Sequence, residues 1–277
     1  MEKHTATFVR LLLAAAVFML GTADAAPQTV AADSVLRPPT THQWLFGAGR
    51  MNALDTYLSP FEYAGPALSV FHRSERPARW CRDRVTVTGV FSARGAYLHS
   101  PTDDGKEWEG NLSAAGGWHY NFHPAHGLRI GIGGLLEAAT GFTYNTRNGN
   151  NPAQGRLEAD IALSGVAEYG FSIARRKFAW LTQIDVPLAG LMFSPDYGQS
   201  YYELFSLGHR GHNVCATWPL NAPSARIMTT LSAKLLGATL SVGYIGDVRQ
   251  SDVNHIKRHA WHNQFVIGYV RRVVLIR

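Results

Sequence analysis

Serine, histidine and acidic side chains are the groups in this sequence that could support hydrolysis. A lipid hydrolase built on a membrane barrel needs a His and a Ser two residues apart on one outward strand face, with a polar residue on the neighbouring strand to orient the His. His99 and Ser100 are adjacent, so on a strand they would point to opposite faces. Candidates for a protease-like site occur in polar stretches: Asp103, Asp104, Glu107, Asp252 and His255. Because loop acids are usually solvated charge, we expect no enzyme activity and keep an outer-membrane hydrolase as the lesser alternative.

The twelve histidines raise the question of a metal site. They form three local groups, which are His209 with His212, His123 with His126, and His255 with His259 and His262. A borderline metal such as Zn²⁺ needs three or four fixed ligands. No group combines that number with a carboxylate at helical or hairpin spacing, so we expect neither a metal nor a cofactor.

Charged residues recur on one side of alternating segments, where we expect them to line the interior of a barrel. They are Arg94, Glu107, Glu109, Arg129, Glu137, Glu158, Asp160, Glu168, Lys177, Asp185, Arg226 and Lys234. Two functions follow from this mixture of signs. If acids and bases face each other across water, the barrel is a small, weakly selective pore. If they pair across a narrow interior, their own side chains plug the barrel.

The elements that would position these residues are amphipathic strands. In the stretch 260–274, Trp261, Phe265 and Ile267 alternate with His262 and Gln264. Such period-2 alternation predicts β-strands, and a long aromatic strand at the end predicts closure onto the first strand. We count twelve such segments: 43–52, 63–72, 80–99, 107–121, 127–144, 156–170, 176–190, 199–208, 212–219, 224–235, 238–248 and 260–274.

The predicted fold is therefore all-β, a single antiparallel transmembrane barrel of about 12 strands. Ten or fourteen strands stay open, because the segments 63–72, 199–208 and 212–219 are weakly patterned. The connections alternate between longer polar ones and tight ones, which is typical of extracellular loops and short periplasmic turns. An exported soluble β-sandwich or lipocalin-like barrel, with its polar face outward, is the competing prediction.

The start of the chain reads as an export signal. Lys3 and Arg10 supply positive charge before the apolar run 11–20, and Ala23 and Ala25 form a small-residue cleavage site after it. We expect a cleaved signal peptide at 1–25, a disordered lead-in at 26–42, and a barrel at 43–277 in the outer membrane. A membrane anchor is the alternative, although ten apolar residues are few beside the roughly 20 that a spanning helix needs.

The net charge of +6 could suggest a nucleic-acid partner. Lys and Arg are nevertheless scattered through the predicted strands rather than gathered in a basic block with aromatic residues, so we expect none. Cys81 and Cys215 lie six strands apart in the predicted ring of twelve, too far for a disulfide, and we expect free thiols.

The first predicted loop contains an unusual motif within the stretch 44–76. Its residues are Leu54, Asp55, Thr56, Tyr57, Leu58, Ser59, Pro60, Tyr63 and Gly65, followed by Glu75 and Arg76. This stretch resembles an uncharacterised family of outer-membrane β-barrel proteins from Bacteroidota. The resemblance implies an outer-membrane barrel and no assigned biochemical activity.

Tyr57, Leu58 and Phe61 are costly to expose to water, so the loop should fold into the barrel mouth or pack on lipopolysaccharide or a partner. In the first case Asp55 and Glu62 would reach arginines of the lumen.

Taken together, these features of the sequence predict a non-catalytic outer-membrane barrel. It would serve as an accessory part of an outer-membrane protein complex or, alternatively, as a diffusion channel for small solutes. The expected partners are outer-membrane lipid, lipopolysaccharide and other proteins of such a complex.

Overall fold

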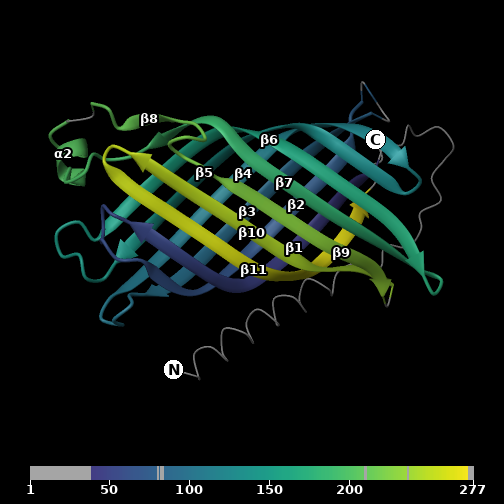
Figure 1. Ribbon diagram of the computed structural model, residues 1–277, viewed down its shortest axis with the longest axis horizontal. Coiled ribbons are helices and arrows are strands. Elements are labelled where there is room, and N and C mark those ends of the chain that lie inside the picture. The colour runs from purple at the N-terminus through teal and green to yellow at the C-terminus, as the bar shows by residue number, and fades with distance from the viewer. Residues whose placement is uncertain (1–38, 80, 82–83, 209–210, 236, 274–277) are drawn as a thin grey trace. The chain divides into compact units, whose positions relative to one another are not determined.

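The structure is a computed structural model that describes residues 39–79, 81, 84–208, 211–235 and 237–273. The elements are β1 Thr40–Asp55, β2 Tyr63–Pro77, β3 Val85–His99, β4 Lys106–Ala125, β5 Leu128–Asn145, β6 Ala153–Ile173, β7 Arg176–Phe193, α2 Tyr201–Phe205, β8 Val214–Thr217, β9 Ala225–Leu235, β10 Ala238–Val253 and β11 Ile256–Val273 (Figure 1). The predicted signal peptide and nearly all of the lead-in lie outside the described residues. The first strand starts at Thr40, slightly before the predicted start at residue 43.

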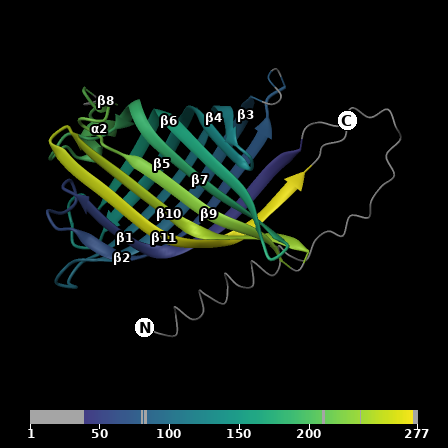
Figure 2. The ribbon, with the colours of Figure 1, turned by 45° about the vertical axis from the view of Figure 1, so that its right-hand side comes forward.

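The sheet closes into a barrel because its first and last strands pair. β1 and β11 are antiparallel from Thr40 opposite Val273 to Asp55 opposite Arg258, and β6 pairs with both β5 and β7. The ring therefore runs β1, β2, β3, β4, β5, β6, β7, β9, β10, β11 and back to β1 (Figure 2). Closure leaves every one of these strands with two neighbours, as a sheet surrounded by lipid requires.

The barrel has ten strands, so the prediction of about twelve is wrong. The two surplus segments, 199–208 and 212–219, belong to one long connection between β7 and β9. In the first, Ser200 and Glu203 form a capping box that starts the short helix α2. In the second, only β8 is extended, and it pairs with β7 alone, over Gly190–Phe193. Because two consecutive segments are absent from the ring, β7 and β9 still run in opposite directions, and the other strands keep their predicted directions.

The two ends of the barrel differ in their connections. At the end that we call the loop end lie the described residues of 56–62, 100–105, 146–152, 194–224 and 254–255. At the opposite end, which we call the turn end, lie the described residues of 78–84, 126–127, 174–175 and 236–237, together with the start of β1 and the end of β11. The predicted asymmetry holds except for the tight 254–255 turn and the longer 78–84 connection. Two turns have both central residues at positive φ, Ala174 and Arg175 at 48° and 64°, and Asn254 and His255 at 50° and 59°.

The strand alternation sorts side chains between the outside and the interior. Large apolar residues point outward, for example Leu136, Ile161, Phe265 and Ile267, each more than 60% exposed. Polar and charged residues on the opposite faces, such as Glu137, are buried inside. A soluble barrel with its polar face outward does not fit this arrangement. Cys81 and Cys215 are free, as predicted, but because they lie at opposite ends of the barrel rather than on opposite walls.

The wall between β7 and β10 is irregular at the loop end. β7 pairs with β9 only over Phe178–Asp185, and β9 begins opposite Val248 of β10. Beyond these points β8 and the turn after it take the place of a strand, with Asp252 N donating to Asn221 O at 2.7 Å and Gln250 N to Ser224 Oγ at 3.3 Å. Pro187, which has no N–H, lies in β7 where its pairing with β9 stops.

Candidate functional site

The interior is crossed at mid-height by buried ion pairs. Arg226 of β9 donates through Nη2 to Asp185 Oδ2 of β7 at 2.8 Å and to Glu137 Oε2 of β5 at 3.1 Å. Arg249 of β10 donates to the other oxygen of Glu137 at 2.5 Å. β5 lies three places from β9 and four from β10 in the ring of ten, so these contacts span the lumen rather than follow its wall.

A second bridge crosses at a similar level. Arg94 of β3 donates through Nη1 to Asp247 Oδ2 of β10 at 2.5 Å, and Arg249 Nε donates to Asp247 Oδ1 at 3.1 Å. Asp185, Asp247 and Glu137 are each at most 3% exposed. Their negative charges are therefore compensated by arginines instead of water, which makes the network intolerant of losing one partner.

Further ion pairs occupy the lumen towards the loop end. Arg156 of β6 donates to Glu109 Oε1 of β4 at 3.1 Å and lies 4.0 Å from Asp55 Oδ2 of β1, which is directly opposite β6 in the ring. Arg258 of β11 donates to Glu158 Oε1 of β6 at 2.8 Å. Charged side chains of β1, β4, β6 and β11 thus pair with one another near the mouth of the barrel.

The turn end has its own cluster. Arg129 of β5 bonds Glu168 Oε2 of β6 at 2.6 Å and Glu75 Oε1 of β2 at 2.8 Å. Arg73 of β2 also bonds Glu75, and its Nε donates to Gln183 Oε1 of β7 at 2.7 Å. β2 and β7 are opposite each other in the ring, so this contact crosses the lumen as well.

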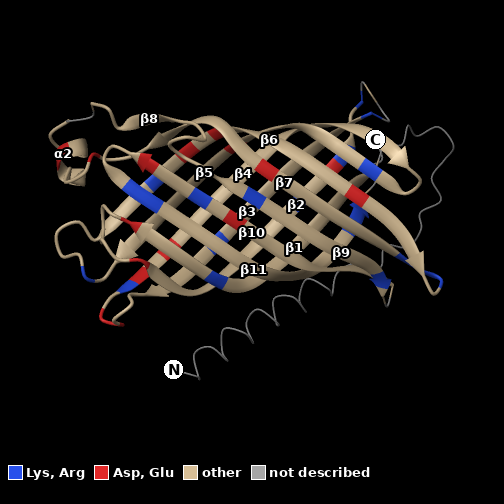
Figure 3. Ribbon diagram, in the orientation of Figure 1, with Lys and Arg blue, Asp and Glu red and all other residues tan. Residues whose placement is uncertain are grey.

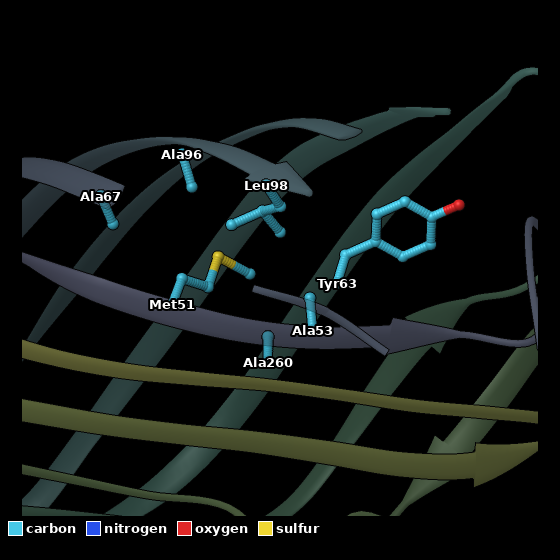
Figure 4. Close-up of a cluster of buried hydrophobic side chains, with 7 residues drawn as sticks. All are labelled: Met51, Ala53, Tyr63, Ala67, Ala96, Leu98 and Ala260. Atoms are coloured by element: carbon cyan, nitrogen blue, oxygen red, sulfur yellow. The ribbon is translucent and has the colours of Figure 1, made fainter. Parts of the chain in front are cut away.

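Apolar side chains fill space between these polar levels. One buried cluster comprises Leu45, Phe71, Val90, Met228, Ile245 and Val266, with Ala115 and Leu181 packed against it, so that eight of the ten strands contribute. The Arg226 guanidinium lies 5.9 Å from the centre of the Phe71 ring. A second cluster lies between β1, β2, β3 and β11, where Met51 extends towards Leu98 and Tyr63 lies beside Ala53 (Figure 4).

Ten of the twelve charged residues predicted to line the lumen have a polar partner inside the barrel. Glu107 accepts from Asn145 Nδ2 at 2.9 Å, Asp160 lies 3.9 Å from Arg249, and the other eight belong to the pairs above. Lys177 and Lys234 share the inward phase of their strands but lie at the turn end and are exposed. The lumen residues that sequence reasoning left out are Arg73, Arg156, Asp247, Arg249 and Arg258. Several stand where β2, β10 and β11 extend further than predicted.

The first loop folds into the barrel mouth. Its main chain wraps around Asp55, whose carboxylate accepts from Tyr57 N at 3.1 Å and whose carbonyl accepts from Ser59 N at 2.9 Å. The Tyr57 hydroxyl donates to Gln199 O at 2.8 Å, which ties this loop to the 194–224 connection. Glu62 was expected to reach a lumen arginine, and this prediction is wrong. Its carboxylate instead accepts a hydrogen bond from Asn52 Nδ2 at 3.3 Å at the rim of the barrel.

Other residues of the predicted motif serve this loop in different ways. Leu54 lies within β1, Thr56 Oγ1 accepts from Lys257 N at 2.9 Å, Leu58 is buried, and Pro60 is exposed. A Cβ at Gly65 would lie 2.1 Å from the Tyr97 carbonyl oxygen, so only glycine allows β2 and β3 to approach there.

Two loop residues have shifted pKa values. Burial raises the pKa of Tyr57 to about 12, helped by the nearby Tyr201, Asp55 and Glu203. Hydrogen bonds from Thr102 and Ser100 hold the pKa of the loop residue Asp104 below its ordinary value.

The outward His-x-Ser spacing that a barrel lipase needs is present at His72 and Ser74 on β2, a pair that sequence reasoning missed. His72 Nε2 lies 3.1 Å from His42 Nδ1, and the rings of Trp44 and His72 lie 4.3 Å apart. The Ser74 hydroxyl, however, donates to Gly89 O at 3.4 Å. Among the described residues no hydrogen bond joins this serine to a base, so the pair lacks the contact that activates a nucleophile.

A second grouping of serine, histidine and acid lies inside the barrel. His119 Nε2 is 2.8 Å from Ser164 Oγ, which donates to Asp185 Oδ1 at 2.6 Å, and His119 Nδ1 is 3.0 Å from Thr88 Oγ1. The carboxylate therefore contacts the serine instead of orienting the histidine. His119 and Ser164 have no exposed surface, and the grouping acts as a structural hydrogen-bond chain.

The family model for "Protein of unknown function (DUF3316)" matches residues 10–277. The chain belongs to the DUF3316 family. A comparison with curated proteins finds no match. The family description assigns no activity, so the function of this DUF3316 barrel has to be argued from its own residues.

Several solved outer-membrane barrels are similar to this DUF3316 chain in fold. The transport unit of the autotransporter AIDA-I from Escherichia coli is 8% identical, with 89% of this chain and 93% of that chain covered, at a TM-score of 0.39. The translocator domain of the autotransporter NalP from Neisseria meningitidis is 10% identical, covering 96% and 95%, at 0.37. An outer membrane channel from Pseudomonas putida F1 is 9% identical, covering 89% and 100%, at 0.34. At such identities and scores no activity is transferred.

No group of three or more metal-ligating side chains occurs among the residues that the structure of the DUF3316 barrel describes. A small cavity lies under the turn that closes the β7–β10 wall, with Glu158, Asp160, Arg249 and Arg258 on its lumen side. Its volume is about 30 Å³, room for about one water molecule. It offers no space for a solute.

Proposed function

We propose that this DUF3316 protein is a non-catalytic integral barrel of the outer membrane and serves as a structural or accessory component of an outer-membrane complex. The observation that carries the proposal is the set of side chains crossing the lumen. Arginine–carboxylate pairs join strands that lie three to five places apart in a ring of ten. They recur near both ends and at mid-height, with apolar clusters between them.

The alternative function, a diffusion channel for small solutes, requires water between the walls. Acids and bases that face each other across water define a selective pore, whereas acids and bases in contact occupy the pore themselves. Here Glu137 contacts two arginines from the far wall and is 2% exposed. This arrangement favours the plugged barrel over the channel.

Localisation and partners follow from the outward surface. The apolar belt supports a barrel surrounded by outer-membrane lipid, with the loop end towards lipopolysaccharide and the turn end towards the periplasm. The first-loop motif supports an origin in the Bacteroidota. Exposed apolar residues of the 194–224 connection, including Tyr202 at 66% and Phe205 at 62%, support a protein partner at the loop end.

Single-channel recording in planar bilayers tests the plugged interior. The refolded, heat-modifiable protein should insert and give no discrete current steps. A Phe71→Ala/Met228→Ala/Glu137→Ala/Arg249→Ala variant removes bulk from two levels of the lumen and both partners of one ion pair. It should give steps and so show that the barrel inserts under these conditions. Reproducible steps from the unmodified protein would reject the accessory role in favour of the channel.

The accessory role itself needs a partner. A photo-crosslinking residue at Tyr202 should yield one defined protein adduct when outer membranes are irradiated. The matched position is Trp118, which is exposed on the lipid-facing side of β4 and should yield lipid adducts only. Identical adduct patterns at both positions would contradict a partner at the loop end.

A further inference from the structure

The turn end of the barrel carries a ring of exposed basic side chains, which we call the basic collar. Its members come from β2, the connection before β3, the β6–β7 turn with the first residue of β7, and the end of β11: Arg76, Arg79, Arg84, Arg175, Arg176 and Arg271. Figure 3 shows blue segments repeatedly at this end of the ribbon, opposite α2. The collar is spread around the perimeter and is not a patch on one side.

In the described part of the turn end, acidic residues do not neutralise the collar. Among the described residues of the turn end, the carboxylates Glu75 and Glu168 are both bonded to Arg129 in the lumen. The loop end differs, because its exposed acids are interleaved with bases, as in the pair Arg147–Asp104 at 2.6 Å. Over the residues that the structure describes, the loop end therefore has exposed charges of both signs and the turn end has exposed positive charges.

The collar adjoins aromatic residues of the kind that sit at the level of lipid headgroups. Arg84 Nη1 donates to the Tyr120 hydroxyl at 3.4 Å. Arg176 lies two residues before Phe178 on the same outward face of β7, and the Phe178 ring stacks on Phe171 with centres 5.5 Å apart. Arg271 lies two residues after Tyr269, which is paired with Trp44. Guanidinium groups just beyond such a girdle are placed where lipid phosphates lie.

We infer that the basic collar binds the phosphate groups of anionic phospholipids in the leaflet around the turn end. The inference rests on the membrane-spanning barrel proposed above. Lipids surround a barrel on all sides, and so does the collar, whereas an acidic protein would need its positive partner surface on one side. Each Lys or Arg near an anionic membrane surface strengthens binding by about fivefold, an effect that salt screens.

The test uses the full refolded chain in nanodiscs that contain equal amounts of phosphatidylglycerol and phosphatidylcholine, and native mass spectrometry of the lipids that the released barrel retains. The unmodified protein should retain phosphatidylglycerol over phosphatidylcholine by at least tenfold at low salt, and less at high salt. The Arg175→Glu/Arg176→Glu variant should lose most of this preference, and Arg271→Glu should lose part of it.

The matched control is Lys106→Glu/Lys257→Glu, which reverses exposed charges at the loop end and should keep the full preference. All variants must first show the heat-modifiable migration of the folded barrel. Equal retention of the two lipids by the unmodified protein, or an equal loss in the loop-end control, would overturn the inference. Retention of neither lipid would instead contradict the membrane-spanning barrel on which it rests.

Discussion

At the scale of single residues, the lumen charges act as structural partners of one another. Arg226 satisfies Glu137 and Asp185 and also lies over the Phe71 ring. The sequence analysis placed these acids and bases correctly on the inward faces of their strands but could not say whether they meet. That depends on distances across the barrel, and a ten-strand ring brings opposite walls closer than a twelve-strand ring.

The tyrosine at the barrel mouth gives a prediction at this scale. The pKa of Tyr57 is raised from 10.0 to about 12, chiefly by burial. Because the folded-state pKa is above the unfolded value, the packing of the first loop is fully stabilising below about pH 10 and weakens as the pH rises towards 12. The difference in tyrosinate absorbance between the native chain and Tyr57→Phe should therefore titrate near pH 12. A midpoint near 10 would mean that the loop is not packed in the mouth.

At the scale of elements, the alternating pattern predicted the strands correctly wherever a segment pairs with a strand on each side. Seven of the predicted segments that the barrel retains are longer in the structure, because hairpin pairing continues beyond the apolar belt. The prediction of barrel strands at 199–208 and 212–219 is wrong, for a reason that the local sequence pattern does not reveal. β8 is four residues long and pairs on one side only, and the capping box at Ser200 favours a helical turn instead.

The β6–β7 turn gives a prediction at the scale of elements. Its two residues, Ala174 and Arg175, both adopt the left-handed conformation, at φ 48° and 64°. For an alanine this conformation costs roughly 1 kcal/mol, which glycine avoids. Ala174→Gly should therefore raise the free energy of unfolding in urea by up to roughly 1 kcal/mol.

Ala179→Gly is the control from the same hairpin. It lies inside β7 opposite Gly170, so the added flexibility should lower the free energy of unfolding by roughly 0.5–1 kcal/mol. Two changes of the same sign would argue against left-handed strain in the turn.

At the scale of the whole molecule, the outward apolar faces form the belt that lipid should contact. Leu136 is 66% exposed in the middle of β5. Leu136→Arg should lower the free energy of unfolding from lipid vesicles by roughly 2–4 kcal/mol, because a midplane charge must leave water.

The control for the belt is Tyr144→Arg. Tyr144 lies on the same outward face of β5 as Leu136 but near the loop end. There the expected loss in the free energy of unfolding is roughly 0–1 kcal/mol. Equal costs at the two positions would contradict a membrane midplane near Leu136.

The sequence by itself determined the all-β class, the inward and outward faces of the strands and the antiparallel phase, because strand alternation has a period of two that local residues fix. It also indicated the inward fold of the first loop through Tyr57 and Leu58. Only the tertiary structure decided the count of ten strands, the roles of α2 and β8, and the pairing of charges across the lumen. Those features depend on which strands become neighbours and on the width of the closed ring, and no single segment encodes either.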